Sequence, residues 1–457
     1  MSTLSRTSAA PLEQALVELL DRTRRRTLEL VEPLSDEALN AVHDPLMSPI
    51  AWDLGHIANF EEIWLVQHVG RRGPLRDELG PIYDQFVAPR RDRGKLPYLR
   101  SEDCLDYMQA VRDLTLAHLA EADMSEGSDP VLARGFIYEL VARHEQQHSE
   151  TILQTLQIMT AQPYARARSA TPEISAGARP RSRASTAPLH DGMVFVESGP
   201  FEMGAPSDWF AYDNERALHT VEVGSFWIDQ HPVTNGSMVE FIEDRGYGAR
   251  ECWSQEGWEW KEKEGIALPK YWKREHDSYW VREFGRTQPL DPARPACHVS
   301  WHEAEAFARW AGKRLPSEAE WEKAACWSPQ GAEKAPYPWG EEPWRPARAD
   351  LDQLGFGTSP IGSHPEGASS YGVQGMSGGV WEWTASGFEG YPRFQAFPYR
   401  EYSTPFIGGP FKVLRGGAWA TQPLLGTTTF RNWDYPDRRQ IFSGFRCARD
   451  GGASPSI

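Results

Sequence analysis

The sequence predicts an α+β protein in which an N-terminal helical bundle is followed by a loop-rich domain of short strands. Residues 1–161 contain long segments with helical hydrophobic periodicity. After residue 190, short β-type runs alternate with Gly, Pro and aromatic residues. The length of 457 residues is enough for two or three domains, each with its own core.

The first region is expected to form an up-down bundle with short to moderate loops. Apolar periodicity and helix-start signals predict helices over 11–31, 35–43, 48–69, 101–123 and 129–161. Ser48 is the expected N-cap of the third helix, with Pro49 at its first helical position.

Residues 162–189 are predicted to be a linker, because they are rich in Ala, Arg, Ser and Pro and poor in large apolar side chains. The loop-rich domain then covers 190–450, and 451–457 form a short tail. All of the 19 tryptophans except Trp52 and Trp64 lie after the bundle. Helices are expected in this domain at 235–244, 301–311 and 317–325.

Composition limits the function classes. The formal charge of −16 argues against nucleic acid or an anionic membrane surface as a partner. The five cysteines are scattered, with no C-x-x-C pair, which suits a reducing cytoplasm. No stretch approaches 18 apolar residues, and the N-terminus has no apolar signal region. A cytoplasmic protein is expected, and its oligomeric state is left open.

His144 and His148 are the most informative pair in the chain. They lie one helical turn apart on an apolar stripe that includes Val141 and Ile152, so both imidazoles are expected to point inward. Two neutral imidazoles in a core are difficult to satisfy with hydrogen bonds alone, whereas one metal ion satisfies both. The alternative is a pair of core histidines with ordinary partners.

The same residues contain H-E-x-x-H, the helical pattern of zinc peptidases in which Glu145 would be the general base. The extended form of that pattern needs Gly at 151 and His at 154, where this chain has Thr151 and Gln154. Another peptidase branch needs a carboxylate on a following helix, but an irregular linker follows. A peptidase is therefore not expected.

His56 is the best candidate for a third metal ligand. Its stripe of Trp52, His56, Asn59 and Ile63 is predicted to face inward. His68, near the end of the same helix, is expected to serve as a C-terminal cap instead. Three neutral histidines without a carboxylate leave coordination positions open. Iron(II) suits such a site, although ligand type alone also permits zinc.

Motifs in both regions resemble known families. The bundle is similar to DinB-like domains with an H-x-x-x-H-x-E pattern, matched by His144, His148 and Glu150. The second region resembles the sulfatase-modifying-factor fold of formylglycine-generating enzymes, which has a C-type-lectin-like shape. The matching segments are 201–204 (FEMG), 298–301 (HVSW), 313–322 (KRLPSEAEWE), 337–340 (YPWG), 380–384 (VWEWT), 414–419 (LRGGAW) and 444–446 (GFR).

The two regions in this order resemble the ergothioneine-biosynthesis sulfoxide synthases, most closely over residues 431–444. Formylglycine-generating members instead carry a cysteine pair just before the final Gly-Phe-Arg. No cysteine lies between Ala420 and Phe442, so that activity is not expected here. The related ovothiol synthases usually carry an added methyltransferase domain, for which this chain has no room.

The resemblance implies a non-haem iron(II) enzyme (Fe2+ cofactor). It would use O2 to join C2 of hercynine (trimethylhistidine) to the sulfur of γ-glutamylcysteine, with oxidation of that sulfur to a sulfoxide. His56, His144 and His148 would be the iron ligands.

The same resemblance implies roles for further side chains. Tyr399 would be catalytic and supply a proton or hydrogen atom, although the pair Tyr399 and Tyr402 also suits a loop-rich core. Hercynine would be bound by four residues, Gln147, Tyr402, Asn432 and Trp433, the last beside the trimethylammonium group. The thiol donor would be bound by Arg90, Arg93, Asp434 and Arg438. Taken alone, the arginines at 90–93 could equally be a solvated basic patch.

Other functions remain open at this point. Free cysteine or a selenosugar could replace γ-glutamylcysteine, and a 5-histidylcysteine sulfoxide synthase would run similar chemistry. A more distant alternative is a non-catalytic binding module with a structural metal, which needs no open coordination position.

Overall fold

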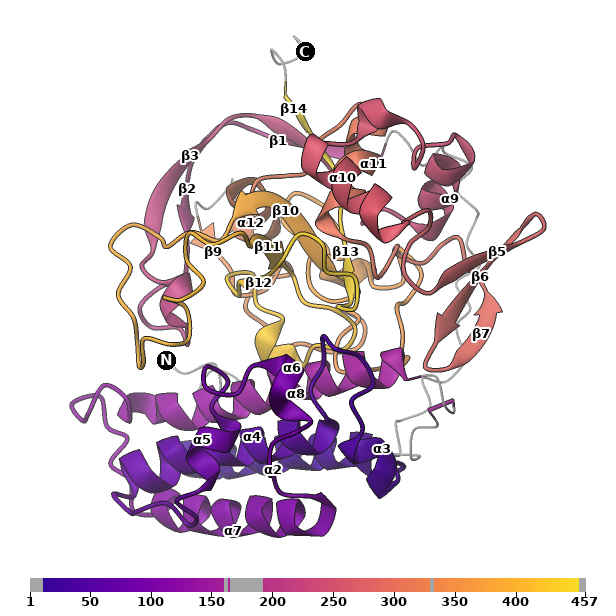
Figure 1. Ribbon diagram of the computed structural model, residues 1–457. Coiled ribbons are helices and arrows are strands. Elements are labelled where there is room, and N and C mark those ends of the chain that lie inside the picture. Colours follow the sequence, from indigo (N-terminus) through magenta and orange to yellow (C-terminus); the bar gives the residue numbers. More distant parts are fainter. Residues whose placement is uncertain (1–10, 160–162, 165–191, 329–332, 452–457) are drawn as a thin grey trace. The chain divides into compact units, whose positions relative to one another are not determined.

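The computed structural model describes residues 11–159, 163–164, 192–328 and 333–451 (Figure 1). The chain divides into two compact units, 1–171 with 284–286 and 172–283 with 287–457. One unit is helical and the other contains several small sheets, so the α+β fold class is confirmed. The predicted linker, apart from Pro163 and Tyr164, and the predicted tail after Gly451 lie outside the described residues.

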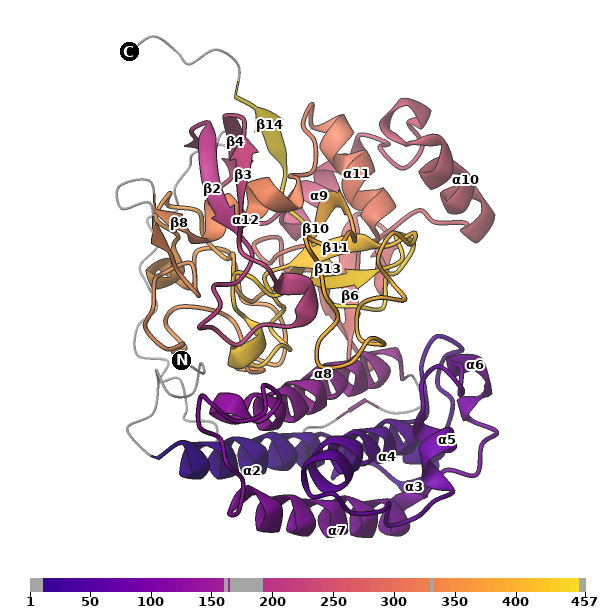
Figure 2. The ribbon, with the colours of Figure 1, turned by 90° about the vertical axis from the view of Figure 1, so that its left-hand side faces the viewer.

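The longest described helices of the helical unit, α2, α4, α7 and α8, lie side by side (Figures 1 and 2). Helix α8 packs against α2 and α4, and α7 packs against α4. The helices of this unit are α2 (Leu12–Val31), α3 (Asp36–Asn40), α4 (Ile50–Glu61), η1 (Glu62–Val69), α5 (Leu79–Tyr83), α6 (Arg90–Arg93), α7 (Ser101–Leu119), η2 (Ala133–Gly135) and α8 (Phe136–Ile158).

The helix predicted over 48–69 differs from the structure in two ways. Pro49, not Ser48, is the N-cap of α4, and the α-helix changes at Glu62 into the π-helix η1. A π-turn holds more residues than an α-turn, so side chains after it fall out of the α-helical stripe. Trp52, His56 and Asn59 are buried as predicted, whereas Ile63 is 42% exposed.

The helix predicted to begin near residue 129 begins at Phe136. Arg134 has φ 57° and Gly135 has φ 74°, and such left-handed backbone interrupts a right-handed helix. The predicted stripe is otherwise confirmed, because Val141, His144 and Ile152 are buried. Polar residues such as Arg143 and Glu145 are buried as well, so α8 is covered on more than one side.

The loop-rich unit holds strands in small sheets rather than in one large sheet. The largest has the order β12-β11-β10-β13, with β10 and β13 parallel and the other neighbours antiparallel. Its strands are β10 (Trp381–Gly387), β11 (Lys412–Arg415), β12 (Asn432–Asp434) and β13 (Ser443–Gly444). The other described strands form smaller sheets. Two of these have three strands each: β1 (Met193–Val196), β4 (Phe226–Asp229) and β14 (Ala448–Asp450) in one, and β5 (Trp272–Glu275), β6 (Ser278–Glu283) and β7 (Arg286–Pro289) in the other. Two have two strands each: β2 (Gly199–Met203) with β3 (His219–Val223), and β8 (Trp327–Ser328) with β9 (Glu333–Lys334).

Four α-helices accompany these sheets in the described part of the unit. The three predicted ones are α9 (Asn235–Glu243), α11 (Trp301–Trp310) and α12 (Glu318–Cys326). Helix α10 (Gln255–Glu264) was not predicted, because its sequence has little apolar periodicity. Its end signals were present in the sequence, because Ser254 caps its start and Gly265, with φ 65°, ends it. Short 3-10 turns complete the unit at η3 (Asp213–Glu215), η4 (Arg250–Cys252), η5 (Pro365–Gly367) and η6 (Pro423–Leu425).

The core of this unit forms where α12 contacts β2, β3, β10 and β11. Trp321 of α12 is fully buried, and its indole nitrogen donates to Glu382 at 2.7 Å. Gly416 has φ 91°, and a Cβ there would lie 3.0 Å from the Trp321 ring. Glycine at 416 is therefore required both by backbone conformation and by packing. Among the described residues, no helix has the length and apolar character needed to cross a membrane.

Candidate metal centre and active site

Three histidines from two helices meet inside the helical unit. His56 lies on α4, and His144 and His148 lie one turn apart on α8. One ring nitrogen from each histidine lies within 4.8 Å of those of the other two. The distances between ring centroids are 5.1 Å for His56 and His144, and 4.6 Å from His148 to either of them. The structure thus brings together the three predicted metal ligands.

His56 is held in one orientation by contacts on its edge and on its face. Its Nδ1 lies 2.7 Å from the backbone carbonyl oxygen of Tyr83, so Nδ1 carries the proton and Nε2 is left to bind a metal. The Trp52 ring stacks on the imidazole at 5.0 Å and 11°. The guanidinium of Arg93 covers the Trp52 ring at 3.6 Å. A stack of three side chains therefore fixes the ring plane of His56.

The two histidines of α8 are supported by α4 as well. Asp53 is buried, and its Oδ1 lies 3.3 Å from Nδ1 of His148. Phe60 stacks on His144 at 3.7 Å and 14°. Asp53 and Phe60 were not predicted from the sequence. For Asp53 the sequence did contain a signal. This acid lies three residues before His56, so it shares a helix face with it, and the neighbouring positions are apolar.

The chemistry of the three rings suits a metal. Burial lowers the pKa of His56 and His144 well below the usual value, and the neighbouring His148 acts in the same direction with a smaller effect. Both rings are therefore neutral at pH 7. Neutral imidazoles bind a metal without first losing a proton. The Nδ1 atom of His144 is buried and has no hydrogen-bond partner among the described residues. An unsatisfied buried nitrogen is costly, and coordination would satisfy it.

Glu145 does not face this group. Its carboxylate accepts a hydrogen bond from Arg24 at 2.9 Å and lies 3.5 Å from Arg112, in a buried cluster completed by Glu61. A carboxylate that is engaged by two guanidiniums and turned away from the histidines cannot serve them as a general base. The arrangement agrees with the sequence argument against a peptidase.

The buried cluster leads to a stability prediction. Glu145→Ala would leave Glu61 as the buried carboxylate that Arg24 and Arg112 share, with the exposed Asp21 4.0 Å from Arg112. Removing one partner of a buried ion pair typically costs about 3–5 kcal/mol, so we expect a loss of this size in the free energy of unfolding. Urea denaturation followed by circular dichroism measures it. Glu18→Ala, at an exposed position of α2, is the control and should change stability by less than about 0.5 kcal/mol. Equal stability of both variants would contradict the prediction.

The arginines proposed for the thiol donor lie on or beside α6. Arg90 is exposed and donates to the carbonyl oxygen of Leu46 at 3.1 Å. Arg93 is only 5% exposed and donates to the carbonyl oxygen of Ala88 and the hydroxyl of Ser48. Burial lowers the pKa of Arg93 to about 10, so it keeps its charge at pH 7. Arg93 is thus an interior cation, not part of a solvated basic patch.

The remaining predicted residues of the helical unit are on α8. Gln147 is half-buried and directly precedes His148. Glu150 of the H-x-x-x-H-x-E pattern is 7% exposed.

In the loop-rich unit, the predicted residues gather in an aromatic cluster. Tyr399 and Tyr402 meet edge to face at 6.1 Å, and Tyr402 meets Trp433 in the same manner at 6.0 Å. Phe388 stacks on Trp433 at 4.0 Å. Asn432 directly precedes Trp433 on β12. The structure therefore places these four predicted residues, Tyr399, Tyr402, Asn432 and Trp433, in one neighbourhood.

Asp434 and Arg438 form an ion pair across a turn. Arg438 Nε lies 3.5 Å from Asp434 Oδ1, and the side chains are 23% and 25% exposed. The chain turns at Pro436, and the amide of Arg438 donates to the carbonyl oxygen of Tyr435. Both charged groups are partly open to solvent and therefore accessible to a ligand.

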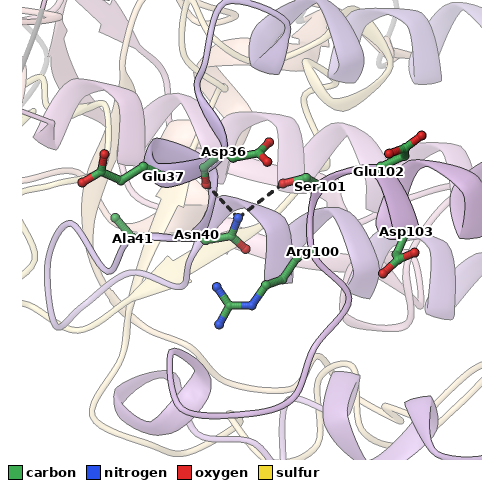
Figure 3. A pocket seen from close by; sticks show the side chains of 8 residues that line it. All are labelled: Asp36, Glu37, Asn40, Ala41, Arg100, Ser101, Glu102 and Asp103. Atoms are coloured by element: carbon green, nitrogen blue, oxygen red, sulfur yellow. Dashed lines mark hydrogen bonds between the residues drawn. The ribbon is translucent and has the colours of Figure 1, made fainter.

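A separate surface pocket lies at the ends of α3 and α7 (Figure 3). Asn40 bridges its two sides by donating to the carbonyl oxygen of Asp36 at 2.7 Å and to the hydroxyl of Ser101 at 3.4 Å. The other lining residues are Glu37, Ala41, Arg100, Glu102 and Asp103. None of the predicted site residues lines this pocket.

Comparison with known proteins extends over both units. The Sulfatase-modifying factor enzyme 1-like domain matches residues 179–451, and the DinB superfamily matches residues 19–152. A hercynine oxygenase of Mycobacterium tuberculosis is 40% identical over 435 residues, which are 94% of this chain and 97% of that protein. A hercynine oxygenase of Mycolicibacterium smegmatis is also 40% identical, over 96% of this chain and 99% of that protein. The chain belongs to the hercynine oxygenase family.

Membership in the hercynine oxygenase family accounts for both halves of the chain. A formylglycine-generating enzyme of Thermomonospora curvata is 31% identical to this chain. The match covers 96% of that enzyme but only 59% of this chain. The hercynine oxygenases match the helical unit too, where the three histidines lie. The predicted resemblance to sulfoxide synthases of this type is thereby confirmed at the level of the family.

Proposed function

We propose that this protein is an iron(II)-dependent hercynine oxygenase that joins C2 of the hercynine imidazole to the sulfur of γ-glutamylcysteine. One C–H and one S–H bond break, a C–S bond forms, and the sulfur becomes a sulfoxide. One oxygen atom of O2 enters the sulfoxide and the other leaves as water, so atoms and electrons balance. The observation that carries the proposal is the three-histidine group in a chain of this family.

His56, His144 and His148 would hold the metal. Three neutral imidazoles suit Fe2+ among other ions. Among the described residues, the group contains no carboxylate, so coordination positions are left for substrate groups. Bound iron(II) would supply the activation of dioxygen. The residues around it act by orientation, because Tyr83 and Trp52 fix the ring of His56 and Asp53 lies 3.3 Å from Nδ1 of His148.

Hercynine would be recognised by polar and aromatic side chains. Gln147 and Asn432 carry amides that can pair with its imidazole or carboxylate. Trp433 offers an aromatic face to the trimethylammonium group, with Tyr402 beside it. A quaternary ammonium cannot donate a hydrogen bond, so an aromatic face is the neutral partner that attracts it best.

Tyr399 would hold a proton for the reaction. Burial raises the pKa of its phenol far above the usual value, and the neighbouring Tyr212 and Asp213 act in the same direction. The group therefore remains protonated at pH 7 and can donate its proton to substrate-derived oxygen.

The donor is proposed from charge complementarity. γ-Glutamylcysteine carries two carboxylates and one ammonium, and Asp434 and Arg438 offer one charge of each sign within 3.5 Å. Arg90 and Arg93 are proposed as further cations for the carboxylates of the donor. Free cysteine, a selenosugar or the substrates of a 5-histidylcysteine sulfoxide synthase would use fewer of these groups.

The five cysteines, all within the described residues, are thiols, which supports the cytoplasm as the site of the reaction.

The direct test is anaerobic loading with Fe2+ followed by aerobic incubation with hercynine and either γ-glutamylcysteine or cysteine. Mass spectrometry of the products and oxygen consumption are measured together. We expect the γ-glutamyl sulfoxide as the main product, with oxygen consumed in proportion. A metal-containing protein that consumes no oxygen with any of these donors would instead be a binding module.

Arg438→Ala is expected to raise the Michaelis constant for γ-glutamylcysteine by at least about tenfold. Loss of one charge-assisted contact typically costs about 1.5–3 kcal/mol. Free cysteine lacks the γ-glutamyl group and should be affected much less. Steady-state kinetics with both donors measure the difference.

The matched control is Arg449→Ala, which removes an exposed guanidinium from β14 in a different sheet. It should leave both Michaelis constants unchanged. An equal loss for both donors in Arg438→Ala would show that Arg438 supports the fold, and a wild-type preference for cysteine would overturn the donor assignment.

A further inference from the structure

The short turn η3 buries three consecutive polar residues. Asp213, Asn214 and Glu215 are each at most 2% exposed. Glu215 closes the turn by accepting from the backbone amide of Tyr212 at 2.9 Å. Buried polar side chains are costly unless they are hydrogen-bonded, so their partners indicate what the turn holds in place.

Asp213 holds the segment that carries the two predicted tyrosines. The hydroxyl of Ser403 donates to Asp213 Oδ1 at 2.5 Å and accepts from the side-chain amide of Asn214 at 3.0 Å. The backbone amide of Phe397 donates to the same carboxylate. Residues 397 and 403 bracket Tyr399 and Tyr402, so one carboxylate fixes the segment on both sides of them.

The same turn also contacts the tyrosine rings. The Tyr212 ring stacks on Tyr402 at 4.5 Å and 11°, and Tyr402 in turn meets Tyr399. The phenol of Tyr212 and the carboxylate of Asp213 both lie close enough to the Tyr399 phenol to raise its pKa, after the larger effect of burial. Asp213 therefore acts on Tyr399 through the backbone of the loop and through its charge.

On its other side, the turn is bonded to the chain that leads into β12. Arg431 donates to the carbonyl oxygen of Asn214 at 2.8 Å, and Thr429 donates to Glu215 at 2.6 Å. Asn432 and Trp433 follow immediately in the sequence. The turn thus connects the tyrosine loop with the strand that carries the proposed hercynine-binding residues.

We propose that Asp213 is a positioning residue for Tyr399, which holds the Tyr399 hydroxyl in place for proton donation. This inference rests on the role proposed for Tyr399. The hydrogen bonds that the Asp213 carboxylate accepts are charge-assisted, so they hold the loop more firmly than those of a neutral amide would. Burial raises the pKa of Asp213 to about 6, so at pH 7 the protein keeps a carboxylate in surroundings that disfavour its charge.

A double-mutant cycle with product analysis tests the proposal. Asp213→Asn keeps the shape and the acceptor for Ser403 but removes the charge. We expect it to lower kcat for sulfoxide formation about ten- to a hundredfold, the scale for a misplaced reacting group, with both Michaelis constants within about twofold of wild type. In the Tyr399→Phe background the same change should have almost no further effect, because the group that Asp213 positions is already absent.

Two further variants separate charge from anchoring. Ser403→Ala keeps the carboxylate but removes one anchor, and should show a smaller loss that also vanishes in the Tyr399→Phe background. Glu401→Gln is the matched control, since Glu401 is an exposed acid on the same loop that also raises the pKa of Tyr399. It should retain wild-type turnover and product distribution.

The outcomes are distinguishable. If Asp213→Asn and Tyr399→Phe lower kcat additively, or if Asp213→Asn changes only thermal stability, the positioning role is wrong. If Asp213→Asn does not fold, the Ser403→Ala variant takes its place in the test. Additive losses of kcat for Ser403→Ala and Tyr399→Phe would then show that the positioning role is wrong. If the wild-type protein forms no C–S bond from hercynine and either thiol, the proposed function itself is wrong.

Discussion

Removing any one of the three imidazoles is expected to abolish stoichiometric metal binding, and turnover with it. His56→Ala, His144→Ala and His148→Ala each leave two ligands in a group whose nitrogens lie within 4.8 Å of one another. Loss of a supporting contact around a metal ligand typically costs about 10- to 100-fold in metal affinity, and loss of the ligand itself should cost more. Metal analysis after anaerobic loading and dialysis measures the effect.

The fold should survive these substitutions. His56 and His144 lie in helices that are buried by many apolar side chains, and no hydrogen bond from His144 Nδ1 within the described residues is lost. His68→Ala is the matched control, because His68 lies on η1, directly after α4, and packs against Trp64 outside the group. It should bind one equivalent of metal. Full metal content and turnover in His56→Ala would show that the third ligand is misassigned.

The three-histidine group was predictable because hydrophobic periodicity determines which side chains point inward. His144 and His148 follow one stripe, and His56 lies on a second helix whose stripe is also buried. Two inward faces of one small bundle must meet in its core, so their polar residues must meet there as well. Periodicity failed where the helix itself changed: the π-turn after Glu61 exposed Ile63, and left-handed backbone at Arg134 delayed the start of α8.

The supporting residues were not predictable in the same way. Asp53 contacts His148 across two helices, and no local pattern specifies which acid on α4 does so. The distance between Asp213 and Ser403, 190 positions apart in sequence, is determined by packing of loops that have no periodicity. Motif resemblance located Tyr399 and Trp433, but the turn at 212–216 that connects their segments is visible only in three dimensions.

Tyr399→Phe is expected to lower the rate of sulfoxide formation by about 10²–10⁴, the usual contribution of a positioned acid. The substitution removes one hydroxyl and keeps the ring that contacts Tyr402. Both Michaelis constants should therefore stay within about twofold of wild type, and the melting temperature should change little. Mass spectrometry should also detect more oxidation of the thiol sulfur to a sulfinate without C–S bond formation, since oxygen is still activated beside the sulfur.

Tyr435→Phe is the matched control, because Tyr435 is a 40% exposed tyrosine of the same unit and has no proposed role. It should reproduce wild-type rate and products. The decisive comparison is between the rate and the product distribution. A structural tyrosine would lower stability or substrate affinity without changing the ratio of sulfoxide to sulfinate. A proton donor changes that ratio because one of two competing reactions needs its proton. If the ratio and the rate are both unchanged in Tyr399→Phe, the tyrosine has no part in the reaction, and the aromatic cluster around Trp433 serves binding alone.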